Sequence, residues 1–369
     1  MKKFAFIFLA AAAMLAACSK VSETRDAEQR PISFQVARYS LTKADPADYK
    51  TDYQNVPFGA YAWYKGVSAA DNANFMTNQK VSWNAGESAW LPEGSTYYWP
   101  KSGTLDFVCY SPYSTDTQMI AVAEDKVAFS AYTPDQDDLM YADKATGLND
   151  NITTHYYSGV PVLFHHALAR VRFQVKAAYL QKTADTGDKT KWEITVNSAS
   201  VQGVHTTGDL ALTLSDGAWK LPESKVWTPA QATRDIPFET RDLTVLTAEP
   251  QALGAAQLVL PQTLGEQKVT LDVTIKTYRD TGNGFQLFLT ESNVVLTSRL
   301  ALKDLPQWGI NQDITYTLAI APVRSDGSNP SDPGKPVDPD DPDLRDAVIT
   351  FDPAVVDWEV VSLNATISL

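Results

Sequence analysis

The chain is poor in cysteine, in long apolar runs and in net positive charge, and each shortage excludes a class of protein. It has 369 residues but only two cysteines, Cys18 and Cys109, so an intramolecular disulfide needs both. Beyond its first residues it lacks the roughly 20 apolar residues in a row that span a bilayer, so any membrane attachment must be through a lipid. A formal net charge of -13 repels polyanions, which argues against nucleic acid and anionic lipid surfaces as partners.

The residue patterns of common active sites and metal sites are also missing. The four histidines, His155, His165, His166 and His205, do not have zinc-motif spacing, and adjacent strand residues point to opposite faces. There is no Gly-x-Ser-x-Gly elbow and no phosphate-binding glycine loop. Residues 325–346 contain many aspartates, but their prolines prevent the tight wrap of a calcium loop and no glutamate closes it. We therefore expect no enzyme activity, no metal and no cofactor.

What the chain does have begins with the three parts of a secretory signal. Two lysines form a basic start, residues 4–14 are mainly apolar, and small residues precede Cys18. The Leu-Ala-Ala-Cys ending resembles the bacterial lipobox, in which the cysteine becomes the new N-terminus and carries acyl chains such as palmitate. We predict a signal peptide over residues 1–17, lipidation at Cys18 and a lipidated tether over residues 18–31.

Hydrophobic periodicity predicts β-strands along most of the chain. Apolar and polar residues alternate, as in strands with one buried face, at residues 105–110, 169–175, 192–196 and 269–275. Glycine-containing turn signals separate the segments at residues 101–103, 186–188, 215–217 and 281–284. Long helical patterns are absent, although residues 134–145 have room for one helical turn. A 44% hydrophobic content supports a large core, and the length fits about two domains, so we predict repeated antiparallel sandwiches with Cys109 buried on a strand.

The C-terminal end combines a tether with two strand-like pieces. Residues 325–346 are rich in proline and aspartate, which predicts an extended, solvated linker. The pieces at 347–352 and 358–369 are rich in β-branched residues. They either fold back onto their own domain or, on this flexible arm, add a strand to a neighbouring molecule. The last piece has the strongest alternation of the chain, with an apolar row of Val361, Leu363, Ala365, Ile367 and Leu369.

Short motifs follow one another along the chain at residues 32–34, 42–44, 99–100, 139–142, 164–170, 259–262, 351–353 and 356–358. Their order, together with the lipobox, resembles the fimbrillin family of Bacteroidetes, the major and minor subunits of type V pili. The resemblance covers nearly the whole processed chain. It implies an all-β fold of two tandem transthyretin-like antiparallel β-sandwich domains, at residues 32–168 and 169–324, and a donor-strand segment at residues 347–369.

The resemblance also implies a route of processing. Family members are exported as outer-membrane lipoproteins, a trypsin-like protease removes an N-terminal strand, and the empty groove accepts a donor strand from another fimbrial subunit. Here the removable strand is residues 32–41. The family protease is usually arginine-specific, and the family motif Thr-Arg-Ala has lysine at its central position in this chain. The candidate cleavage residues are therefore Lys43 itself and Arg38, five residues upstream as a substitute. Cuts at Arg25 or Arg30 leave the strand attached.

We therefore expect a structural subunit of a cell-surface fimbria that supports adhesion, first as a lipoprotein exposed on the outer membrane and then within the fimbria. The C-terminal segment favours a stalk or anchor position over a tip adhesin. The alternative is a surface-exposed glycan-binding lipoprotein, because aromatic platforms on β-sandwiches stack against sugar rings, although such residues also fill cores. The aromatic residues concerned are Tyr61, Trp63, Tyr64, Trp83, Trp90, Tyr97, Tyr98 and Trp99.

Overall fold

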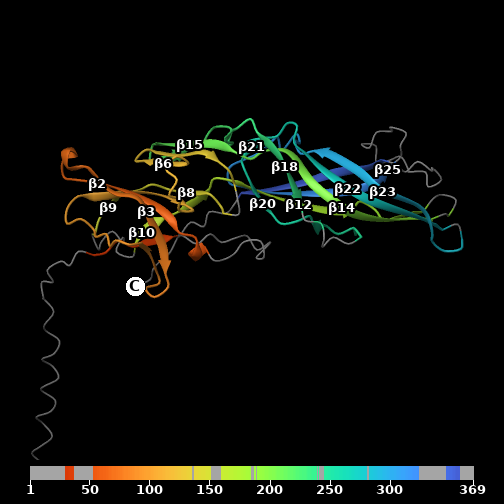
Figure 1. The fold of residues 1–369 in the computed structure, drawn as a ribbon, viewed down its shortest axis with the longest axis horizontal. Helices are drawn as coiled ribbons and strands as arrows, with labels where there is room; N and C mark the ends of the chain where they lie inside the picture. Colours follow the sequence, from red (N-terminus) through yellow and green to blue (C-terminus); the bar gives the residue numbers. More distant parts are fainter. Residues whose placement is uncertain are drawn as a thin grey trace, which may run out of the picture.

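The computed structural model describes residues 30–36, 53–134, 137–150, 159–183, 187, 189–238, 240, 245–280, 282–323 and 346–357. Within these ranges the regular structure is β-strand, apart from two short 3-10 turns at Tyr53–Asn55 and Ala69–Asp71. The predicted all-β fold is confirmed. Figure 1 shows the strands gathered in two halves that lie side by side along the long axis of the molecule.

The N-terminal half is built on a nine-stranded sheet with the order β10, β1, β4, β3, β2, β5, β8, β11, and with β9 also paired to β5. Strands β9 and β10 lie next to each other, so the sheet curls round on itself. Its concave face encloses a core that includes Phe58, Phe107 and Phe164. The strands are β1 (Phe34–Val36), β2 (Phe58–Lys65), β3 (Ala73–Asn84), β4 (Ala89–Pro92), β5 (Thr104–Ser111), β8 (Met140–Ala142), β9 (Ala145–Leu148), β10 (Val160–Val162) and β11 (Phe164–His166).

A smaller sheet covers the opposite face of the nine-stranded sheet. Its order is β16, β15, β7, β6, with β17 paired to β15. Alternate residues of β5 serve the two faces, because Phe107 and Cys109 lie in the first core while Val108 and Tyr110 pack toward the smaller sheet. The strands are β6 (Ile120–Ala123), β7 (Lys126–Tyr132), β15 (Gly208–Ser215), β16 (Ala218–Lys220) and β17 (Thr228–Pro229).

The C-terminal half is a sandwich of two five-stranded sheets. One has the order β19, β12, β25, β26 with β20 on β12, and the other has the order β13, β14, β22, β23 with β18 on β14. Between them, the ring of Phe173 stacks on that of Tyr316 with centroids 5.0 Å apart. The strands are β12 (Ala169–Ala177), β13 (Gln181–Thr183), β14 (Lys189–His205), β18 (Thr233–Phe238), β19 (Gln251–Ala252), β20 (Gln257–Val259), β22 (Lys268–Asp280), β23 (Gln286–Arg299), β25 (Gln312–Val323) and β26 (Asp346–Asp357).

The two halves share strands and a core. The expected boundary between residues 168 and 169 falls between β11 and β12, but the later strands β15, β16 and β17 return to complete the smaller sheet of the N-terminal half (Figure 1). Trp227 lies where the halves meet: its ring stacks on Phe129 with centroids 6.0 Å apart, and its Nε1 donates to the Ala167 carbonyl at 2.8 Å. A short pair of strands, β21 (Gln262–Thr263) and β24 (Gln307–Trp308), completes the described structure.

The local predictions are largely confirmed. The four alternating segments lie within β5, β12, β14 and β22. The turn predicted at 215–217 joins β15 to β16, with Asp216 and Gly217 at φ of 54° and 80°. The room for a helical turn at 134–145 is not used in the described residues of that segment, because β8 and the start of β9 lie there and pair with β5.

Candidate functional site

Strand β1 is an interior strand of the nine-stranded sheet, and it is the candidate site because its removal would open that sheet. It pairs in parallel with β10, where Phe34 is opposite Val160. On its other side it pairs with β4 through Phe34 and Trp90. The sequence predicted a strand within residues 32–41, and the structure places its described part between these two neighbours.

The side chains of this segment belong to the core. Ile32 is 1% exposed and Phe34 is 3% exposed. The Phe34 ring meets Phe58 and Phe107 edge to face, with centroids 5.5 Å and 5.7 Å apart. Between them in the sequence Ser33 is half-buried, and Gln35 faces outward. The alternation puts one apolar row of the segment into the core, as in any strand with one buried face.

Backbone hydrogen bonds hold the segment on both sides. Ile32 donates to the Tyr97 carbonyl at 2.7 Å, Arg30 accepts from the Trp99 N–H at 3.0 Å, and Ser33 accepts from the Val160 N–H at 2.8 Å.

The close approach of β10 to β1 depends on a glycine. Gly159 has a φ of +127°, and a Cβ there would lie 3.0 Å from the Gln35 nitrogen and from the Phe34 carbonyl carbon. Any larger residue would therefore push the two strands apart. The absence of a side chain at Gly159 therefore allows β1 to lie closely against β10.

The candidate cleavage and lipidation residues lie outside the described residues. Cys18, Arg38 and Lys43 all lie there. Arg30 is described: its guanidinium lies 3.5 Å from the Asp150 carboxylate. A cut after Arg30 would leave Ile32 and Phe34 on the subunit, in line with the expectation from the sequence.

The C-terminal segment is described in part. Strand β26 pairs antiparallel with β25 over its full length, from Asp346 opposite Val323 to Asp357 opposite Gln312. It forms the edge of its sheet. This part of the predicted donor segment therefore pairs within its own chain. The apolar row of Val361, Leu363, Ala365, Ile367 and Leu369 lies outside the described residues.

The other residues singled out from the sequence have structural surroundings. Burial raises the pKa of the Cys109 thiol well above its ordinary value, so the reactive thiolate is disfavoured. His165 bonds to Asp143 at 2.8 Å, and His166 bonds to Asp138 instead. Among the described residues, no group of three potential ligands that could hold a metal comes together.

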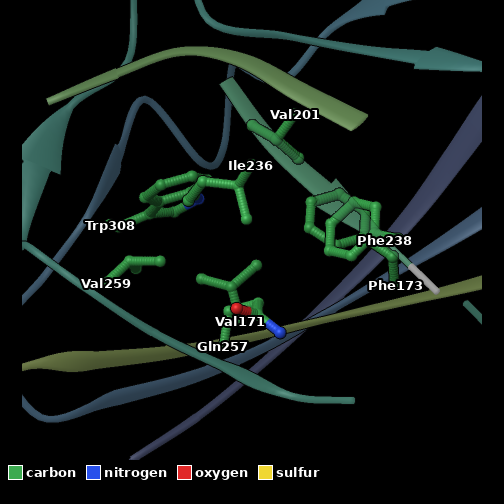
Figure 2. A pocket seen from close by; sticks show the side chains of 8 residues that line it. All are labelled: Val171, Phe173, Val201, Ile236, Phe238, Gln257, Val259 and Trp308. Carbon is green, nitrogen blue, oxygen red and sulfur yellow. The ribbon is translucent and has the colours of Figure 1, made fainter. Parts of the chain in front are cut away.

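Two hollows in the described structure differ in character. A void in the C-terminal core has a volume of about 10 Å³, which holds no more than one water. Figure 2 shows the side chains around it, which are mainly apolar. Its lining is Val171, Phe173, Val201, Ile236, Phe238, Gln257, Val259 and Trp308. A larger cleft of about 250 Å³ opens in the N-terminal half, beside Tyr61 and Trp63.

The predicted aromatic cluster is divided between the two faces of the nine-stranded sheet. Trp90 and Trp99 lie in the core on the concave face. Tyr61 and Trp63 lie on the other face, and Tyr98 is 45% exposed. The sequence did not assign these aromatic residues to faces of a sheet, because the order of strands is set by contacts between residues far apart in the chain.

Comparison with known proteins places the chain in a family. The sequence profile of the fimbrillin-like family matches residues 42–325, and the chain therefore belongs to the fimbrillin-like family, as the sequence motifs predicted. No curated protein matches it. The described part of the chain contains no helix with the length and apolar character that a bilayer crossing needs.

Solved structures of low sequence identity align with most of the chain. A fimbrial protein from Bacteroides vulgatus is 15% identical, with a TM-score of 0.55 over 89% of this chain and 100% of its own. A putative cell adhesion protein from Bacteroides uniformis is 17% identical, with a TM-score of 0.47 over 89% and 99%. The fimbrial anchor protein Mfa2 from Porphyromonas gingivalis is 11% identical, with a TM-score of 0.30 over 90% and 99%. The first of these supports the all-β architecture.

Proposed function

We propose that this chain is a structural subunit of a cell-surface fimbria, anchored first in the outer membrane through acyl chains on Cys18 and assembled by protease-triggered donor-strand exchange. Membership of the fimbrillin-like family supports the fimbrial part. One observation carries the exchange part: β1 is a short interior strand whose residues Ile32 and Phe34 fill the core. Such a strand both completes the subunit and blocks its groove.

The physical basis of the switch is the loss of paired backbone and buried apolar surface. When β1 leaves, the edges of β10 and β4 lose their partner, and buried unpaired backbone groups are costly. Burial of side chains such as Ile32 and Phe34 contributes about 1.5–3 kcal/mol each. Binding of another strand with apolar residues at alternate positions therefore lowers the free energy of a cut subunit. An uncut subunit has no vacancy and stays monomeric.

The donor in this proposal is residues 358–369 of another subunit. Their apolar row at Val361, Leu363 and Ile367 has the same two-residue period as Ile32 and Phe34, so one register puts it into the vacated core. Because β26 pairs with β25 in its own chain, it serves as the fixed base from which the following residues reach a neighbour. The partners are therefore other fimbrial subunits and a trypsin-like processing protease, and a tail with this alternation supports a stalk or anchor position.

The test is controlled cleavage of the full chain. Trypsin itself is unsuitable, because Arg345 precedes the donor and would also be cut. A site for a sequence-specific protease placed directly after Lys43 removes only the N-terminal segment. We expect cleavage to convert monomers into multimers that resist heat in detergent, while the same insertion left uncut stays monomeric.

Native material tests the site of the natural cut. N-terminal sequencing of fimbriae sheared from cells is expected to begin after Arg38 or Lys43, and the double variant Arg38→Ala, Lys43→Ala is expected to accumulate as lipidated monomer. The matched control is Lys101→Ala, which changes an exposed lysine away from the segment. Surface fimbriae that retain residues 32–36 would contradict the proposal.

A further inference from the structure

The cleft of about 250 Å³ lies on the face of β2 that points away from the core of Ile32 and Phe34. Strands β2 and β3 form its floor, and β6, the edge strand of the smaller sheet, forms its wall. The lining consists of Tyr61, Trp63, Asn74, Met76, Thr77, Val122, Ala123 and Glu124. Aromatic rings and polar groups therefore converge on one hollow, which is the usual composition of a small-molecule site.

Two aromatic rings that stack on each other, here called the platform, line the cleft. Tyr61 and Trp63 lie two residues apart on the same face of β2, with ring planes inclined by 16° and centroids 6.3 Å apart. Tyr61 is nearly buried and Trp63 is half-buried, so part of the larger ring stays accessible. Irregular pairing of β3 with β2 around Ala62 brings Asn74 opposite Trp63. Such bulges redirect side chains at the edge of a site.

The polar groups at the rim are placed to accept and donate hydrogen bonds. The Glu124 carboxylate lies 2.5 Å from the Lys65 ammonium and 3.3 Å from the buried Lys144 ammonium. The hydrogen bond from Lys65 lowers the pKa of Glu124, so the group is an ionised acceptor at neutral pH. The structure shows no hydrogen-bond partner for the Asn74 amide or the Thr77 hydroxyl among the described residues, and both are exposed to a ligand.

We propose that this cleft binds one neutral sugar ring of a glycan. A pyranose ring has an apolar face that stacks on an aromatic ring and a belt of hydroxyls that pair with carboxylate and amide groups. The volume is just below the roughly 300 Å³ at which sites for larger ligands begin, so it suits one ring. The net charge of -13 disfavours the approach of sialic and uronic acids, so we expect the ligand to be an uncharged sugar.

This inference goes beyond the role of a fimbrial subunit and does not depend on strand exchange. The platform packs with the core on the smaller-sheet side, whereas Ile32 and Phe34 lie in the core on the concave side. Cleavage after Lys43 and sugar binding can therefore be measured separately. An uncut monomer is expected to bind sugar, and a variant without the platform is expected still to assemble.

The test uses the uncut full chain and an array of neutral oligosaccharides, followed by saturation-transfer NMR with the best neutral sugar found. We expect Trp63→Ala to weaken binding at least about tenfold, since it removes the stacking surface. The matched control is Trp83→Ala, which removes a half-buried tryptophan of β3 that packs against Trp90 instead, and it is expected to leave the affinity unchanged.

Two exposed positions keep the test valid if the tryptophan variant does not fold. Asn74→Ala and Thr77→Ala change exposed side chains and leave the core intact, and each is expected to weaken binding several-fold with an unchanged melting temperature. The proposal fails if no neutral glycan binds the wild type, if sialylated glycans bind equally well, or if the folded Trp63 and Asn74 variants bind like the wild type.

Discussion

Phe34 packs into the N-terminal core from the described part of the removable segment. It is 3% exposed and touches two aromatic rings edge to face. We expect Phe34→Ala to lower the free energy of unfolding of the uncut subunit by about 3–5 kcal/mol, because it removes a large side chain from a packed core. Urea denaturation followed by tryptophan fluorescence measures this change.

The neighbouring Gln35 provides the control for that measurement. It lies on the same strand but faces outward, so Gln35→Ala is expected to change the free energy of unfolding by no more than about 0.5 kcal/mol. Equal effects of the two substitutions would contradict the burial pattern of β1. The resemblance to the fimbrillin family implied a strand here, but it did not show that Phe34, rather than Gln35, has aromatic partners that come from residues 58 and 107.

Tyr110 makes the stability of the N-terminal half sensitive to alkaline pH. Its hydroxyl donates to the Asn78 side-chain oxygen at 2.6 Å and accepts from the Ser114 N–H at 3.2 Å. Burial raises the pKa of Tyr110 to about 12. Because this pKa is above the unfolded value of about 10, the contribution of the group to stability is complete below pH 10 and declines as the pH rises toward 12.

The variant Tyr110→Phe isolates this effect. It loses the two hydrogen bonds and is expected to be less stable than the wild type at pH 8 by about 1–2 kcal/mol. By pH 11 the wild type should have lost about 1 kcal/mol of that advantage, since only its phenol titrates at this position. Urea unfolding at both pH values measures the difference. A gap that stays constant or widens with pH would show that the phenol is not protected by burial.

Strand β26 shows which part of an element the sequence can define. The alternation and the β-branched residues predicted strands at the end of the chain, and both pairing within the chain and pairing with a neighbour remained open. The structure pairs residues 346–357 with β25. Periodicity reports which face of a strand is buried, but not which strand lies beside it, so the partner was out of reach of a single sequence.

Two truncations separate the structural and the assembly parts of the tail. Deletion of residues 358–369 is expected to leave the melting temperature unchanged and to abolish growth of multimers after cleavage. Deletion of residues 346–369 is expected to lower the melting temperature as well, because it removes a twelve-residue strand and exposes the edge of β25. Thermal unfolding followed by circular dichroism measures the melting temperatures of both truncated chains. If the chain that lacks only residues 358–369 does not fold, these residues form part of the core of their own subunit.

The whole molecule is more interlocked than the sequence indicated. The expected boundary between residues 168 and 169 falls between two strands, and residues 208–229 then return to the N-terminal half, where Trp227 packs against Phe129. The return of β15 to the N-terminal half cannot be seen in the local periodicity of the sequence, since β15 alternates like any other strand. The candidate site was predicted from the family motifs as a segment, whereas the groove and the sugar-sized cleft depend on pairings between distant residues.

Assembly of whole subunits gives the last prediction, which concerns the face of the donor strand. If residues 358–369 fill the groove left by β1, the apolar row must enter the core while the alternate residues stay in solvent. We expect Ile367→Asp to prevent multimers after cleavage, because it would bury an unpaired charge. Thr366→Asp places the same charge on the opposite face and is expected to assemble. Mixing each variant with cut wild-type subunits and following growth by light scattering compares them, and equal inhibition by both would contradict insertion of this strand.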